Sequence, residues 1–118
     1  MLRQLEATHD NVIGYSLGGE VSDDEYRQAA SELRDAIAMH GKIRVLFRLQ
    51  DVSLQSFLNA LDERFKFVQE HRDDIERVAI VSDDSVTNWL SGLVDRVAPV
   101  ETRHFSRDDE RQAWAWLE

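Results

Sequence analysis

Hydrophobic residues recur along this chain with two periods, and the alternation of these periods predicts strands and helices in turn. Every-second-residue patterns over residues 2–8 and 11–19 predict two short strands. The turn-forming sequence His9-Asp10-Asn11 lies between them, so we expect the two strands to form an antiparallel hairpin.

The first helix is predicted between Ser22 and His40. Its apolar residues are spaced three and four apart, as they are on one face of a helix. Glu25 stands three residues after Ser22, which is the spacing of a capping box. Gly41 is the residue type that most often follows a helix, so we expect the helix to end there.

The clearest strand is predicted over residues 43–49. Its apolar residues alternate with Arg44 and Arg48, which therefore face the opposite side of the sheet together with Leu46. Strands that are buried on both faces are apolar throughout. The two arginines therefore predict that this face of the sheet is not fully covered by helices.

The rest of the chain continues the alternation of strands and helices. The pattern predicts a helix around Leu54–Val68, a strand at Arg77–Val81, a helix around Val86–Val97, a strand at Val100–Phe105 and a closing helix that ends near Leu117. The order is β-β-α-β-α-β-α-β-α, and strand–helix–strand units favour parallel pairing. We therefore expect one α/β domain over residues 1–118, with a mixed sheet.

Composition narrows the classes of partner. The 118 residues suffice for one domain, and the absence of cysteine excludes disulfides and thiolate chemistry. The net charge of −9 opposes binding to nucleic acid and to anionic membrane surfaces. No apolar run is long enough for a stable membrane insertion, and the first residues do not resemble a secretory leader. We therefore expect a cytoplasmic protein.

Candidate chemistry is sparse. Four Asp-Asp pairs, the first at Asp23-Asp24, suggest either cation binding or helix capping, and capping is favoured because no calcium-loop pattern follows them. The histidines lack the spacing of a zinc site. No serine stands next to a suitable histidine in the sequence. We therefore expect no enzyme activity, no metal and no cofactor.

The segment after the central strand offers hydroxyl groups. Ser53 and Ser56 follow the strand and precede a predicted helix, whose N-terminus would stabilise a phosphoryl group. Alternatively, Asp51 or Ser53 is simply the N-cap of that helix. The residues alone leave both interpretations open.

Aromatic residues are in excess of what one helix face can bury. Phe67 lies off the apolar stripe of its predicted helix, and Trp114 and Trp116 cannot both face one direction. This surplus predicts a groove or a homodimer contact, with packing at the flanks of the helices as the alternative.

The order of these elements resembles the SpoIIAA-like group of STAS domains. The resemblance is carried by five stretches along nearly the whole chain, namely Gly19–Tyr26, His40–Leu46, Glu76–Val81, Arg103–Phe105 and Ala115–Leu117. Related proteins with an Asp-Ser-Ser/Thr-Gly motif are phosphorylated after the central strand. This chain lacks that motif and reads Asp51-Val52-Ser53-Leu54-Gln55-Ser56-Phe57 there.

The resemblance implies a mixed sheet with helices packed largely on one face, and binding without chemistry. Similarity of the wider fold to lipid-carrier domains implies a small non-polar ligand, whose pocket is expected at Phe57, Leu61, Trp89 and Leu93. The alternative is a protein-interaction module of a regulatory pathway, which would contact a regulatory protein partner through Asp51, Ser53 and Ser56.

Overall fold

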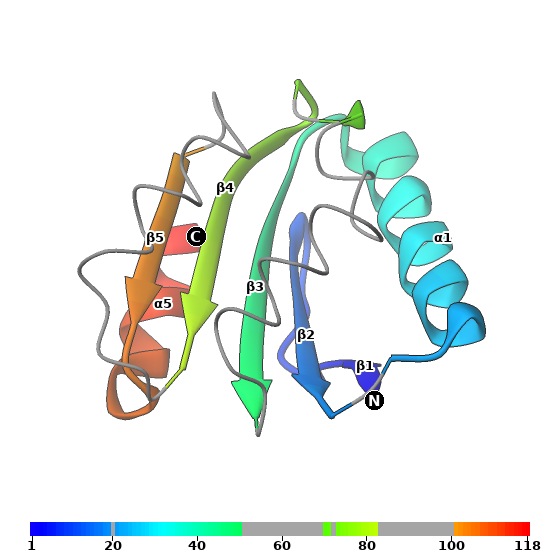
Figure 1. The fold of residues 1–118 in the computed structure, drawn as a ribbon. Helices are drawn as coiled ribbons and strands as arrows, with labels where there is room; N and C mark the ends of the chain where they lie inside the picture. Colours follow the sequence, from blue (N-terminus) through cyan, green and yellow to red (C-terminus); the bar gives the residue numbers. More distant parts are fainter. Residues whose placement is uncertain (20, 51–69, 72, 83–100) are drawn as a thin grey trace.

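The computed structural model describes residues 1–19, 21–50, 70–71, 73–82 and 101–118 (Figure 1). Five strands in these residues form one sheet, and their order across the sheet is their order in the sequence. Helix α1 (Asp23–His40) connects the second strand to the third, and helix α5 (Glu110–Leu117) follows the fifth. The strands are β1 (Leu2–Gln4), β2 (Val12–Gly18), β3 (Ile43–Gln50), β4 (Ile75–Val81) and β5 (Glu101–Phe105).

The sheet is mixed, as predicted. Strand β1 pairs with β2 in antiparallel fashion, and β2 through β5 are parallel to one another. The register aligns Val45 with Val78, so the predicted parallel pairing of the two central strands is confirmed. The first strand is shorter than residues 2–8, because the carbonyl of Leu5 accepts a hydrogen bond from the N–H of Thr8 at 3.1 Å and closes a turn.

The predicted ends of α1 are also confirmed. The N–H of Glu25 donates to Ser22 Oγ and the N–H of Ser22 donates to Glu25 Oε1, both at 3.1 Å, which is a complete capping box. The other carboxylate oxygen of Glu25 accepts the N–H of Leu2 at 2.8 Å, so this cap also ties α1 to the edge strand. At the other end Gly41 has φ +85°, a conformation that favours glycine.

Each face of the sheet carries its own apolar cluster. Alternate residues of β3, from Ile43 to Leu49, join the cluster under α1, and Leu46 joins the cluster under α5, as the strand pattern predicts. The two described helices therefore lie on opposite faces, and Figure 1 shows α5 behind β4 and β5. The helices predicted around Leu54–Val68 and Val86–Val97 lie outside the described residues, so the expectation of helices largely on one face is not tested.

The arginines of β3 and β4 anchor α5 on their face of the sheet. Arg44 Nη1 donates to the main-chain oxygens of Leu117 and Glu118, at 2.7 and 3.0 Å. Arg77 Nη1 donates to the oxygen of Trp116 at 2.6 Å. These carbonyls lie in the last turn of α5, where helical donors run out, and cations are favoured there. The arginines therefore fasten a helix to this face, while the side chains of Arg44 and Arg48 keep 21% and 30% of their surface exposed, in keeping with the predicted incomplete cover.

The two tryptophans of α5 diverge to either side of its buried stripe. Trp114 packs against β2 at Gly14, and Trp116 lies 5.9 Å from the ring of Phe105 between ring centroids. The guanidinium carbon of Arg77 lies 5.2 Å from the Trp116 ring centroid. Both tryptophans are half-buried. They therefore pack at the flanks of the helix, which was the alternative to a groove or a homodimer contact. Phe67 lies outside the described residues.

Candidate functional site

The residues predicted to bind a ligand all lie in two connecting segments. Phe57 and Leu61 belong to residues 51–69, between β3 and β4, and Trp89 and Leu93 belong to residues 83–100, between β4 and β5. The predicted interaction residues Asp51, Ser53 and Ser56 belong to the first of these segments. All seven residues lie outside the described residues, so their roles in binding remain predictions.

The described strands fix where these two segments begin. Strands β3 and β4 are parallel neighbours, and Arg48 is aligned with Val81 near their carboxyl ends. The chain leaves β3 after Gln50 and leaves β4 after Val81. Both segments therefore start side by side at the carboxyl edge of the sheet. This edge is where open parallel α/β sheets generally bind ligands.

A serine–histidine pair lies at the same edge. The hydroxyl of Ser82 lies 3.1 Å from His104 Nε2, and Ser82 is buried, with 3% of its surface exposed. The main-chain N–H of Ser82 donates to the oxygen of Phe105 at 3.1 Å. The sequence shows no serine next to a suitable histidine, but the fold brings one close. The pairing of β4 with β5 joins Ser82 and His104, which are 22 positions apart.

The hydrogen bond gives both polar groups a partner, as buried polar groups require. A nucleophilic serine would additionally need oxyanion donors and a group that orients the histidine. Strand order across the sheet is the signal that would have revealed the pair, since Ser82 directly follows β4 and His104 precedes the last residue of β5.

Arg107 links the ends of two strands at this edge. Its Nη2 donates to the oxygen of Leu49 at 3.3 Å, so the Arg107 side chain reaches from the segment after β5 to the end of β3. The described part of the carboxyl edge is therefore held together by polar contacts among its own groups.

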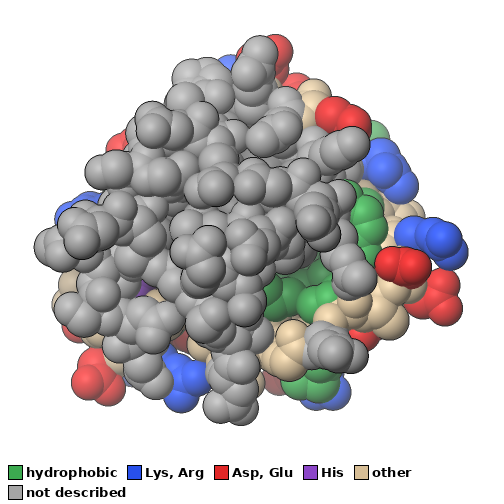
Figure 2. Space-filling model, in the orientation of Figure 1, with side chains coloured by type: hydrophobic (Ala, Val, Ile, Leu, Met, Phe, Trp, Pro, Cys, Tyr) green, Lys and Arg blue, Asp and Glu red, His purple; other side chains and the backbone are tan. Residues whose placement is uncertain are grey.

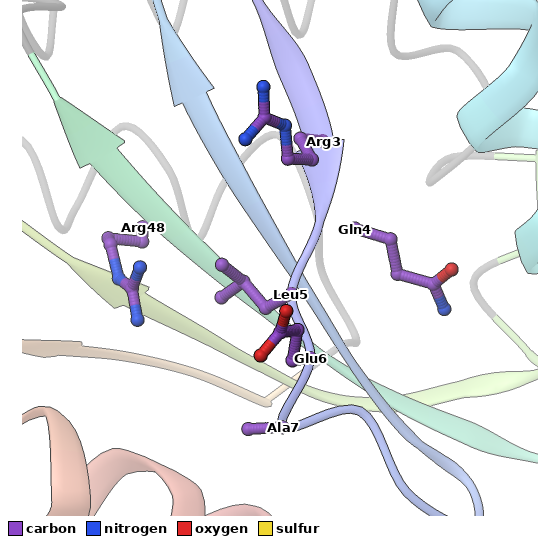
Figure 3. A pocket seen from close by; sticks show the side chains of 6 residues that line it. All are labelled: Arg3, Gln4, Leu5, Glu6, Ala7 and Arg48. Carbon is purple, nitrogen blue, oxygen red and sulfur yellow. The ribbon is translucent and has the colours of Figure 1, made fainter.

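A pocket of about 330 Å³ opens elsewhere, at the edge of the sheet formed by β1 (Figure 3). Its lining is mixed, with three charged residues among six, unlike the non-polar pocket predicted from the sequence. The lining residues are Arg3, Gln4, Leu5, Glu6, Ala7 and Arg48. Arg48 donates through Nε and Nη2 to the two carboxylate oxygens of Glu110, at 2.5 and 2.6 Å. This contact holds the pKa of the Glu110 carboxyl below its usual value.

The acidic pairs have structural positions where they are described. Asp23 and Asp24 lie in the first turn of α1, Asp73 and Asp74 lie in the turn before β4, and Asp108 and Asp109 lie in the turn before α5. Within the described ranges, no three His, Cys, Asp or Glu residues are grouped so that they could hold a metal ion. Among the helices described, none is long and apolar enough to cross a membrane.

A mixed five-stranded sheet with a helix on each face defines the class of protein as a small α/β domain. The family model described as SpoIIAA-like matches residues 12–118, and the chain therefore belongs to the SpoIIAA-like family.

A solved structure of an uncharacterized protein from the DUF3478 family of Shewanella loihica PV-4, with a SpoIIAA-like fold, is similar to this chain. The two are 24% identical, the match covers 100% of this chain and 93% of that one, and the TM-score is 0.65. This likeness supports the fold alone. No curated protein matches the chain significantly.

Proposed function

We propose that the protein is a non-enzymatic binding domain that carries or senses a small non-polar molecule. The ligand is held at the carboxyl edge of β3 and β4 by Phe57, Leu61, Trp89 and Leu93. The observation that carries this proposal is the adjacency of the two strand ends, since the segments with these four residues leave the sheet side by side.

The α1 face near this edge supports a non-polar ligand. Phe47, Leu49 and Ile80 lie on this face and are apolar and buried. Figure 2 shows hydrophobic side chains gathered between α1 and the surface that is not described. Ser82 and His104 add one polar pair to these surroundings. Small-molecule sites generally combine an apolar lining with a few polar groups.

Binding without chemistry is supported by the hydrogen bonds that the polar groups of the carboxyl edge make with one another. Ser82 and His104 bond to each other, and Arg107 bonds to the oxygen of Leu49. These contacts stabilise the strand ends, which is the role such groups have in a binding scaffold.

The second candidate is a protein-interaction module that contacts a regulatory partner through Asp51, Ser53 and Ser56. The position of β3 favours it, because this strand is in the middle of the sheet and residue 51 follows its last residue directly. An exposed partner surface at the centre of the carboxyl edge would suit docking.

Tryptophan fluorescence distinguishes the two candidates. The chain has three tryptophans, and the non-polar ligand would contact Trp89, whereas Trp114 and Trp116 pack on the α5 face. A fatty acid brominated in the middle of its chain quenches tryptophans that it touches. We expect 9,10-dibromostearate to quench about one third of the emission, with saturation at micromolar concentration.

Matched variants assign the quenching to one residue. Trp89→Phe should abolish it, and Trp116→Phe should leave it in place, because Trp116 contacts Phe105 and Arg77 on the other face. Quenching that persists in Trp89→Phe would contradict the proposed site. Absence of quenching in the wild-type protein would contradict the non-polar ligand and leave the interaction module as the better account.

A further inference from the structure

Three polar side chains form a row across the α5 face of the sheet, next to the charged pocket. The strand register pairs Arg3 with Ser16 and Ser16 with Arg48. Ser16 lies on the α5 side, because a Cβ at Gly14, two residues earlier, would meet the Trp114 ring. With neighbouring strands about 4.8 Å apart, the Cα atoms of Arg3 and Arg48 are separated by about 10 Å.

Several hydrogen-bond donors in this row have no acceptor among the described residues. Arg48 uses Nε and Nη2 for Glu110, which leaves the donors of Nη1. Arg3 contacts only the sulfur of Met1, at 3.8 Å, among the residues that the structure describes. Ser16 is 7% exposed, and its hydroxyl has no hydrogen-bond partner within the described ranges. Two guanidinium groups on one face of the sheet are a suitable donor set for a carboxylate.

The same pocket also contains an acid. Glu6 lines it, and no cation of the described residues lies within 4.0 Å of the Glu6 carboxylate. Figure 3 shows Leu5 between the side chains of Arg48 and Glu6, with Arg3 further along β1 and Gln4 pointing to the other side. Arg48 is already neutralised by Glu110, so one guanidinium and one carboxylate remain for a ligand.

We propose that this pocket binds a small zwitterion with a carboxylate and an ammonium group, the chemistry of a free amino acid. The carboxylate of the ligand accepts from Arg3 and Arg48, and its ammonium group donates to Glu6. The volume of about 330 Å³ is at the small end of ligand sites. The net charge of −9 further disfavours a ligand with several negative charges. This site is independent of the proposed carboxyl-edge site.

Three matched probes test the charge requirement: L-phenylalanine carries both charges, N-acetyl-L-phenylalanine only the negative one, and L-phenylalaninamide only the positive one. Each is titrated into ¹⁵N-labelled protein while amide NMR shifts are recorded. We expect L-phenylalanine to bind about tenfold more tightly than either of the other probes. The largest shifts should fall on residues 3–7 and on Ser16.

Exposed residues allow variants that keep the fold. Arg3→Gln and Glu6→Gln should each weaken L-phenylalanine binding about tenfold. The controls are Arg27→Gln and Asp24→Asn, which remove the same charges from an exposed ion pair on α1 and should leave binding unchanged. The inference is overturned if none of the probes shifts residues 3–7. It is also overturned if the N-acetyl probe binds as tightly as L-phenylalanine and Glu6→Gln has no effect.

Discussion

The indole ring of Trp114 fills the space that a side chain at Gly14 would occupy. A Cβ built on Gly14 would lie 2.5 Å from Cη2 of that ring and 3.0 Å from Cδ1 of Leu5. Gly14 does not have a positive φ, so the requirement for glycine is one of space. The close approach of α5 to β2 therefore depends on this residue.

Gly14→Ala should destabilise the protein by about 1–3 kcal/mol, because it overpacks this contact. Chemical denaturation of the single variant measures the effect. In a Trp114→Leu background the cost of Gly14→Ala should fall to less than half, since the ring is gone. An equal cost in both backgrounds would mean that the contact between ring and strand is not the reason for the glycine.

The ion pair between Arg48 and Glu110 should make stability depend on pH. The hydrogen bonds from Arg48 lower the pKa of Glu110 in the folded protein. The stabilisation is therefore complete above the ordinary glutamate pKa of about 4.3 and is lost as pH falls through the lowered value. We expect Glu110→Gln to cost about 1–3 kcal/mol at pH 7 and progressively less below pH 4.

Denaturation across pH measures this difference, with Asp108→Asn as the control because Asp108 is exposed two residues away. If Glu110→Gln and the wild type differ by the same amount at pH 3 and pH 7, the ion pair does not supply the effect.

Glu32 should make stability depend on pH in the opposite direction to Glu110. Burial raises the pKa of its carboxyl, while a hydrogen bond from Tyr15 partly opposes this. Burial, with Glu32 nearby, also raises the pKa of Tyr15. A raised carboxyl pKa gives stability that is present at acidic pH and is lost as pH rises through the folded value.

Glu32→Gln keeps the acceptor and removes the charge. We expect its melting temperature to exceed that of the wild type by about 1–2 °C at pH 7, and this gain to vanish near pH 4, because the carboxyl is partly solvated. Asp35→Asn, an exposed acid on the same helix, should show no such change. A wild type that is more stable than Glu32→Gln at pH 7 would contradict the argument.

The local features of this fold could be predicted from the sequence. The alternation of β3 and the capping box of Ser22 and Glu25 depend on residues a few positions apart, so their periods and spacings are visible in the chain. The contact of Arg44 with Leu117 joins residues 73 positions apart, and nothing local to Arg44 indicates it. The anchoring of α5 by this arginine therefore could not be predicted from the local pattern.

The sites also depend on contacts between residues that are far apart in the sequence. The Ser82–His104 pair depends on which strands are neighbours, and the row of Arg3, Ser16 and Arg48 depends on the register of three strands. Neither the order of the strands nor their register can be predicted from the period of the hydrophobic residues. The predicted pocket residues depend on the resemblance to a family and lie outside the described residues.

Homodimer formation stays a prediction, and it now depends on Phe67. Trp114 and Trp116 are half-buried against the sheet and contribute less apolar surface than expected. We expect the wild type to sediment as a dimer at tens of micromolar protein, more so at higher salt because screening weakens the repulsion between acidic protomers. Phe67→Glu should sediment as a monomer. Two monomeric samples would eliminate the dimer.

The central claim is that this domain holds a small non-polar molecule, and native mass spectrometry tests it most directly. Protein purified from its own cells under non-denaturing conditions should show a mass above that of the chain, and Phe57→Asp should lose the added mass. Extraction with organic solvent should release the bound molecule. A wild-type protein with only the mass of its own chain, or an added mass that Phe57→Asp retains, would contradict the account.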